Sequence, residues 1–89
     1  MMKGRQTYAV TPNQIWWFDK ELNKHPEFAA IVLYPGTMNR HRISVSGNAE
    51  LFRKVASRLE PKMVVSVTGE WSHLHKELLK TADTLEQSG

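Results

Sequence analysis

Apolar side chains recur at helical spacing between residues 48 and 59, and this is the clearest pattern in the chain. The recurring apolar positions are Leu51, Phe52, Val55, Ala56 and Leu59. Asn48 can accept hydrogen bonds from the N–H groups of a first helical turn, and Pro61 is expected to end the helix. We therefore predict a helix from Asn48 to Leu59, with Phe52 and Val55 buried.

Short alternating or β-branched runs predict strands on both sides of this helix. Residues 42–46 (RISVS) alternate strictly between apolar and polar types, and residues 63–68 (MVVSVT) are rich in valine. The apolar run 28–34 is followed by Pro-Gly, which is typical of a turn. We expect this run to pair with residues 42–46 as a hairpin through the loop 35–41.

Both ends of the chain fit either a helix or a strand. Apolar residues between 15 and 22 have helical spacing behind Thr11-Pro12, but residues 14–18 also fit a compact aromatic strand. Residues 74–85 have apolar positions at helical spacing, whereas residues 80–86 fit a terminal strand. Periodicity alone does not decide between the two for runs this short.

Length and composition predict one ordinary globular domain, residues 1–89, with 40% hydrophobic and 24% charged residues. The absence of cysteine excludes a disulfide framework, a thiolate zinc site and a cysteine nucleophile, and it favours a reducing compartment. No apolar run approaches the roughly 20 residues of a membrane span. The first six residues do not resemble a signal peptide, so we expect a cytoplasmic protein. No cofactor is expected.

Basic charge is concentrated in the middle of the chain. The net charge is +3, and the cations cluster between residues 36 and 62. These basic residues are Arg40, Arg42, Arg53, Lys54, Arg58 and Lys62. Such an asymmetry favours an anionic partner.

Three consecutive segments carry a resemblance to a known family. Residues 40–47 (RHRISVSG) are similar to the family's third strand, residues 49–59 to its connecting helix, and residues 65–71 (VSVTGEW) to its fourth strand. Residues 24–27 (KHPE) and 82–86 (ADTLE) extend the likeness more weakly. In this order they resemble the bacterial single-stranded-DNA-binding proteins and the related primosomal replication protein.

The resemblance implies a mainly β fold, a small five-stranded barrel of the oligonucleotide-binding (OB) type with one helix between strands 3 and 4. It also implies a non-catalytic protein that binds single-stranded DNA or RNA with little sequence preference, as an accessory in replication or recombination. Other replication or recombination proteins are then possible partners. A homo-oligomer is expected, because pairing of copies would bury the surplus aromatic side chains.

Single-strand binding requires exposed aromatic faces for base stacking and cations for the phosphates. The candidate stacking residues are Trp16, Trp17, Tyr34 and Trp71. The candidate phosphate-binding residues are Arg40, Arg42, Lys62 and Lys76. Trp71 is expected in a surface loop beside the groove, and at least one of the two adjacent tryptophans is expected in the core or at a subunit interface.

Catalytic and metal-binding motifs are not predicted. His73 and His75 would share one face if they lay on a strand, but no neighbouring carboxylate or cysteine completes a ligand set. No serine–histidine–aspartate arrangement, glycine-rich phosphate loop or H-E-x-x-H helix is present in the sequence. We therefore expect no catalytic residue and no bound metal.

An alternative interpretation takes both ends as helical and adds a short strand at residues 7–10. The chain then becomes an α+β sandwich of the ferredoxin-like type, still with a strand at residues 63–68. Such a domain would suit a protein-binding adaptor or inhibitor encoded by a phage or another mobile element.

Overall fold

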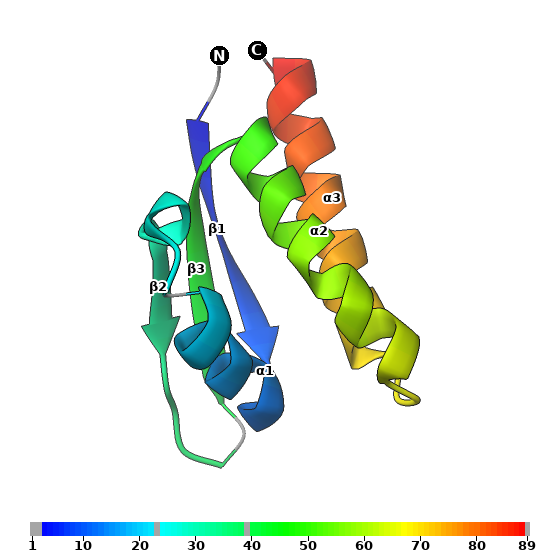
Figure 1. The fold of residues 1–89 in the computed structure, drawn as a ribbon. Coiled ribbons are helices and arrows are strands. Elements are labelled where there is room, and N and C mark those ends of the chain that lie inside the picture. Colours follow the sequence, from blue (N-terminus) through cyan, green and yellow to red (C-terminus); the bar gives the residue numbers. More distant parts are fainter. Residues whose placement is uncertain (1–2, 23, 39, 89) are drawn as a thin grey trace. The chain divides into compact units, whose positions relative to one another are not determined.

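The computed structural model describes residues 3–22, 24–38 and 40–88, and these divide into two compact units (Figure 1). One unit contains residues 5–46 and is called the sheet unit below. The other contains residues 3–4 and 47–88 and is called the hairpin unit. Each unit is described by itself.

Three strands form the sheet: β1 (Lys3–Val10), β2 (Ile31–Tyr34) and β3 (His41–Asn48), in the order β1-β3-β2. Strand β2 pairs antiparallel with β3, with Ile31 opposite Val45 and Tyr34 opposite Arg42. The hairpin predicted between the run 28–34 and residues 42–46 is therefore confirmed for residues 31–34, whereas residues 28–30 precede the strand in a turn. Strands β1 and β2 form the two edges of the sheet.

The segment between β1 and β2 is helical. Helix α1 (Pro12–Trp17) continues as a π-helical turn, η1 (Phe18–Leu22), and a 3₁₀ turn, η2 (Pro26–Phe28), precedes β2. Thr11 and Gln14 form a capping box: the Gln14 N–H donates to the Thr11 hydroxyl (3.2 Å) and the Thr11 N–H to the Gln14 side chain (2.8 Å). This cap and the fixed backbone angle of the proline in the first turn favour the helix over the aromatic strand.

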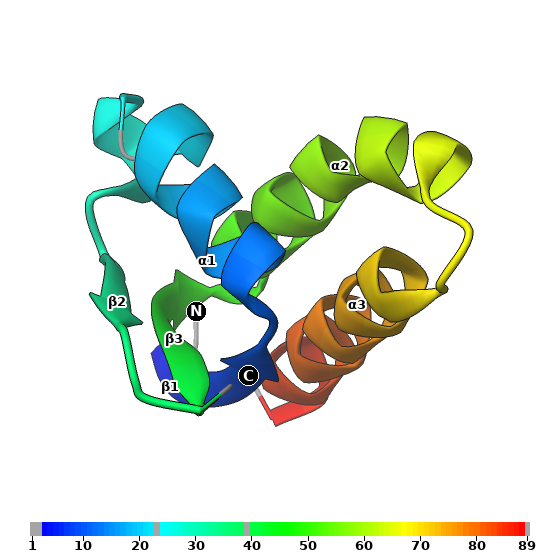
Figure 2. The same cartoon turned by 90° about the horizontal axis from the view of Figure 1, so that it is seen from below.

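The two faces of the sheet differ because side chains alternate along each strand. On one face Ile31 and Val45 are buried beside Ile43, and α1 and η1 lie over this face within the sheet unit (Figure 2). On the other face Tyr34 and Arg42 are exposed. The second face is referred to below as the open face.

The hairpin unit consists mainly of two long helices, α2 (Ala49–Val65) and α3 (Glu70–Ser88), which pack against each other along their length (Figure 1). The Asn48 side chain accepts from the Leu51 N–H at 3.0 Å and caps α2. Phe52 and Val55 are fully buried. The predicted helix, its cap and its buried face are therefore confirmed.

The strand predicted at residues 63–68 is wrong. Helix α2 continues through Pro61 to Val65, and the following residues form the turn into α3. A proline leaves the carbonyl four residues earlier without its helical partner, but both Ser57 and Pro61 are exposed, so water can satisfy that carbonyl. Val64 and Val67 are also exposed. Valine favours strands because its side chain packs on a half-buried surface, and these two side chains have no such surface to pack on.

The five-stranded OB-type barrel with one helix is therefore wrong as a fold class. Of the residues that the structure describes, 60% are helical, and the strands among them form an open antiparallel sheet of three. The terminal strand considered at residues 80–86 is part of α3. The α+β alternative describes the ends of the chain correctly, although its strand at residues 63–68 is also helical or in a turn. The order β1-β3-β2 around α1 is that of a split β-α-β unit.

Candidate nucleic-acid interface

The strands of the sheet carry cations and no carboxylate. Residues 3–10 and 28–48, which include all three strands and the loop between β2 and β3, contain no aspartate or glutamate. The cations in these segments are Lys3, Arg5, Arg40 and Arg42. The carboxylates of the sheet unit lie in the helical segment and the turns next to it. An anionic chain therefore meets no repelling carboxylate from the strands.

Two arginines and a tyrosine meet on the open face. The Arg5 guanidinium donates from Nε to the Ser44 hydroxyl at 2.9 Å and from an Nη to the Tyr34 hydroxyl at 3.3 Å. Arg42 lies directly opposite Tyr34 on the neighbouring strand. Arg5, Tyr34 and Arg42 are all exposed, while Ser44 is buried beneath them. Arg5, Tyr34, Arg42 and Ser44 are called the arginine–tyrosine cluster below.

The structure thus brings together two of the predicted binding residues, Tyr34 and Arg42. Arg40 is exposed in the loop that leads into β3, where its N–H donates to the Thr37 carbonyl at 3.1 Å. Sequence reasoning missed Arg5, although its charge was noticeable. The signal that could have found it is the long strand β1, whose alternation places Arg5 and Tyr8 on opposite faces.

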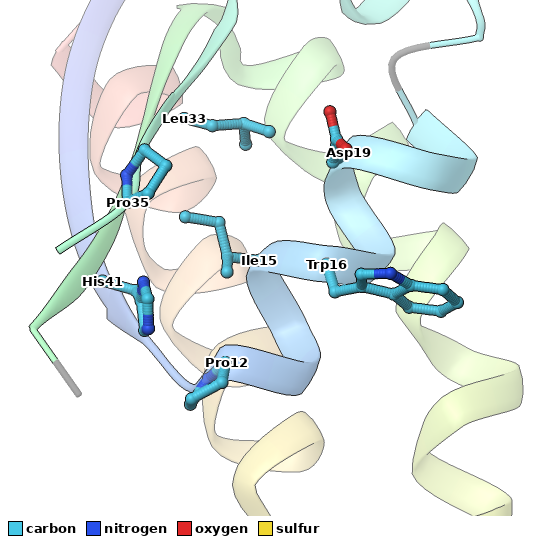
Figure 3. A pocket seen from close by; sticks show the side chains of 7 residues that line it. All are labelled: Pro12, Ile15, Trp16, Asp19, Leu33, Pro35 and His41. Atoms are coloured by element: carbon cyan, nitrogen blue, oxygen red, sulfur yellow. The ribbon is translucent and has the colours of Figure 1, made fainter. Parts of the chain in front are cut away.

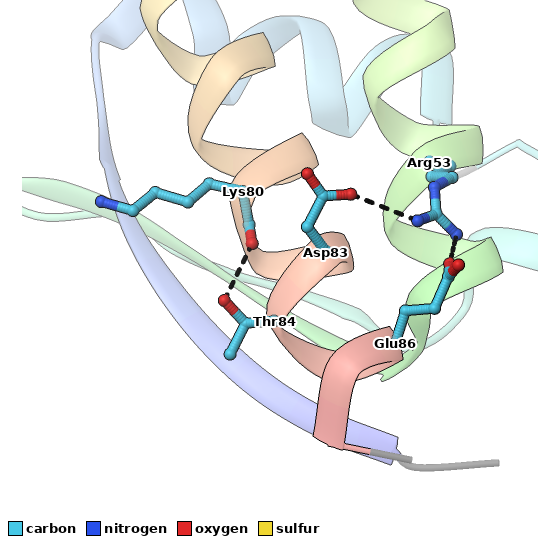
Figure 4. A network of polar contacts seen from close by, with 5 residues as sticks. All are labelled: Arg53, Lys80, Asp83, Thr84 and Glu86. Atoms are coloured by element: carbon cyan, nitrogen blue, oxygen red, sulfur yellow. Dashed lines mark hydrogen bonds and ion pairs between the residues drawn. The ribbon is translucent and has the colours of Figure 1, made fainter.

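Two cations of α2, Arg53 and Lys54, differ from those of the sheet because carboxylates lie beside them. Arg53 pairs with Glu86 and with Asp83, the latter at 3.3 Å (Figure 4). The hydrogen bond to Glu86 raises the pKa of Arg53 above its usual value. Lys54 lies 3.5 Å from Glu50 one turn away. The basic cluster that the sequence shows between residues 36 and 62 is therefore divided: Arg53 and Lys54 pair with carboxylates, whereas Arg40 and Arg42 lie in a segment that contains none.

Trp71 does not lie in a surface loop as predicted. It belongs to the first turn of α3 and is only 5% exposed. The Lys62 ammonium lies over its ring, 5.3 Å from the ring centroid. Base stacking needs an exposed ring face, so the buried Trp71 is not a stacking residue, and Lys62 lies on α2 against its ring.

The remaining predicted residues lie on helices and not on the strands that form the cluster. Trp16 is 62% exposed on α1, and Trp17 is half-buried with its ring edge-on to Phe18 at 5.1 Å between centroids. Lys76 is exposed on α3 of the hairpin unit. His73 and His75 also lie on α3, where residues two apart do not share a face, and no group of three potential metal ligands occurs among the described residues.

A pocket of about 460 Å³ lies between α1 and the end of β2, on the helix-covered side of the sheet (Figure 3). Its lining residues are Pro12, Ile15, Trp16, Asp19, Leu33, Pro35 and His41. Ile15 and Leu33 extend toward the space from opposite sides, whereas the Trp16 ring extends away from the strands. The His41 Nδ1 accepts from the Gly36 N–H at 3.1 Å, which holds the imidazole against the loop.

Comparisons with protein families, with curated proteins and with solved structures gave no match for this chain. Across residues 3–22, 24–38 and 40–88, no helix is both long enough and apolar enough to span a bilayer.

Proposed function

We propose that this protein binds single-stranded nucleic acid on the open face of its sheet, through the arginine–tyrosine cluster. The observation that carries the proposal is the meeting of Arg5, Tyr34 and Arg42 on one face formed by strands that contain no carboxylate. Cations attract the phosphates of the strand, and an exposed aromatic ring offers a surface on which a base can stack. The proposal does not depend on a barrel.

Each group in the cluster has a distinct part in this binding. Arg5 uses two of its five N–H donors to hold Ser44 and Tyr34, which leaves others for a phosphate oxygen. Arg42 offers a second guanidinium beside the Tyr34 ring. Every base has a face that can stack and every nucleotide has a phosphate, so binding is largely independent of sequence and sensitive to salt.

The proposed cellular role follows the same reasoning. A protein that binds single strands without sequence preference suits an accessory role in replication or recombination, without chemistry of its own. A cytoplasmic location is part of the proposal and is supported by the cysteine-free sequence.

Titration of a fluorescent oligo-dT at several salt concentrations, followed by anisotropy, tests the proposal. The unmodified protein should bind at low salt, with affinity that falls as salt rises. Arg42→Ala should reduce the slope of log K against log salt by about 0.7, the value for one phosphate contact with a single strand. Tyr34→Ala should weaken binding by about 1–3 kcal/mol, the value for one stacked base.

Two variants of the same unit serve as matched controls. Lys20→Ala removes an exposed cation from η1, and Trp16→Ala removes an exposed aromatic ring from α1. Both should bind oligo-dT as the unmodified protein does. The proposal is wrong if no binding is seen at low salt, or if the control variants lose as much affinity as Arg42→Ala and Tyr34→Ala.

A further inference from the structure

One edge of the sheet lacks the charged side chains that often prevent strands of different molecules from pairing, although its strand is short. Strand β2 is an edge strand, and alternate residues of an edge strand direct their N–H and C=O groups away from the sheet. Residues 28–39, which include β2, contain no charged side chain. Within β2, Val32 and Tyr34 remain 46% and 44% exposed.

The opposite edge is different. Strand β1 carries Lys3 and Arg5, both exposed, and charged side chains on an edge strand oppose pairing with another copy because like charges would meet. Strand β2 has no charged side chain that would oppose pairing with another copy. Of the two edges of the sheet, β2 is therefore the one on which no charge of the strand itself opposes pairing.

We propose that the β2 edge pairs with β2 of a second copy, antiparallel about a two-fold axis. An uncharged edge is complementary to itself, since neither copy brings a charge that the other would have to neutralise or desolvate. The two edges together make a sheet of six strands, three from each copy. The pairing itself does not depend on the proposed function; only the binding of nucleic acid to the joined sheet does.

The register of the pairing determines which faces join. When Val32 and Tyr34 of one copy meet the same exposed positions of the other, the open faces of both copies lie on one side of the joined sheet. The Arg42 side chains of the two copies are then three strand spacings apart, about 14 Å. This exceeds the Debye length of about 8 Å at physiological ionic strength, so their repulsion is largely screened.

Apolar surface next to β2 adds to the main-chain hydrogen bonds. The strand has four residues, so hydrogen bonds along its edge are few. Leu33 is half-buried and lines the pocket with Ile15 and Pro35, on the side of β2 away from the open face (Figure 3). A second copy seated against β2 would cover part of this lining, which favours a dimer whose formation depends on concentration.

Sedimentation equilibrium without nucleic acid tests the pairing directly. The unmodified protein should show a monomer–dimer equilibrium. Val32→Lys should be monomeric, because two ammonium groups would lie directly or diagonally opposite across the axis. The matched control is Val67→Lys, which places the same charge at a fully exposed valine in the turn of the hairpin unit and should leave the equilibrium unchanged. A mixture of Val32→Lys and Val32→Glu should again form a dimer.

Amide hydrogen exchange gives a second measurement that does not depend on a variant. Protection of β2 amides should rise with protein concentration in the unmodified protein. Protection of α3 amides should rise less over the same concentrations, because α3 is not part of the paired edge. A protein that stays monomeric up to millimolar concentration, or a Val32→Lys variant that dimerises as the parent does, overturns the pairing. A monomer that binds oligo-dT overturns the dimer alone, and a dimer that does not bind overturns the proposed function alone.

Discussion

At the scale of single residues, the contacts of Arg5 determine how the open face presents its charge. Two hydrogen bonds, to Ser44 and to Tyr34, hold the guanidinium across the central strand. A side chain already held in place loses less conformational freedom when it meets a phosphate than a free one does. The buried Ser44 hydroxyl is therefore a positioning group for Arg5, although it cannot itself reach solvent.

Ser44→Ala tests this positioning. Removal of the hydroxyl frees the Arg5 Nε, so binding of oligo-dT should weaken by about 0.5–1.5 kcal/mol, the usual net contribution of one hydrogen bond. Anisotropy measures the affinity, and urea denaturation reports the stability. Ser57→Ala, at an exposed position of α2, is the control. If Ser44→Ala binds with unchanged affinity, the bond between Ser44 and Arg5 has no part in binding.

Trp71→Ala should affect stability rather than binding. The ring is buried in α3, and truncation of a buried tryptophan typically costs about 3–5 kcal/mol. Trp16→Ala removes a ring that is mostly exposed and should leave the melting temperature nearly unchanged. Thermal unfolding followed by far-UV circular dichroism compares the two without relying on tryptophan emission. Equal melting temperatures for both variants would contradict the buried position of Trp71.

At the scale of secondary structure, the elements with several agreeing local signals could be predicted. Residues 48–59 combine a cap with a helical period, and the run 28–34 combines apolar character with a turn signal. The prediction for residues 63–68 fails because valine content is its only signal, and because α2 does not end at Pro61 as expected. Helix α2 packs against α3, and the helix continues through these valines despite their preference for strands. No local pattern in the sequence reveals this packing.

The candidate site was predictable to a similar extent. Tyr34 and Arg42 could be found because an aromatic residue and a cation border the same predicted hairpin loop. Arg5 could not be placed beside them, since its pairing with β3 depends on contacts 39 residues apart in the sequence. Trp71 was misplaced because its polar neighbours occupy the exposed positions of a helix, not of a loop.

Pro61→Ala examines the continuation of α2. Alanine restores the N–H that Pro61 lacks within the helix, and proline is about 3 kcal/mol less favourable than alanine at an interior position. Proline also restricts the unfolded chain, which offsets the gain by about 0.4–1 kcal/mol. The variant should therefore be more stable by about 2 kcal/mol in urea denaturation. If Pro61→Ala is less stable than the unmodified protein, proline stabilises this position of α2 more than alanine does.

At the scale of the whole molecule, the distribution of charge follows the type of element. The strands carry cations alone, whereas α2 and α3 carry both signs and pair them across the hairpin, as Arg53 does with Asp83 and Glu86. Exposed ion pairs of this kind contribute little to stability but leave little net field for a ligand. The modest net charge of +3 therefore understates the attraction that the strands offer to a polyanion.

The contact between Gly4 and α3 has a consequence for how the chain folds during its synthesis. The hairpin unit is built from residues 3–4 and 47–88, and a Cβ atom at Gly4 would lie 2.6 Å from the Leu85 Cδ2. The sheet unit is continuous in sequence and can form while the ribosome is still adding α3. Residues 3–4, which are made before the sheet unit, thus wait for residues of α3, which are made after it. Closure of so long a loop adds only about 0.6 kcal/mol for each doubling of length, so the delay affects the order of folding more than the final stability.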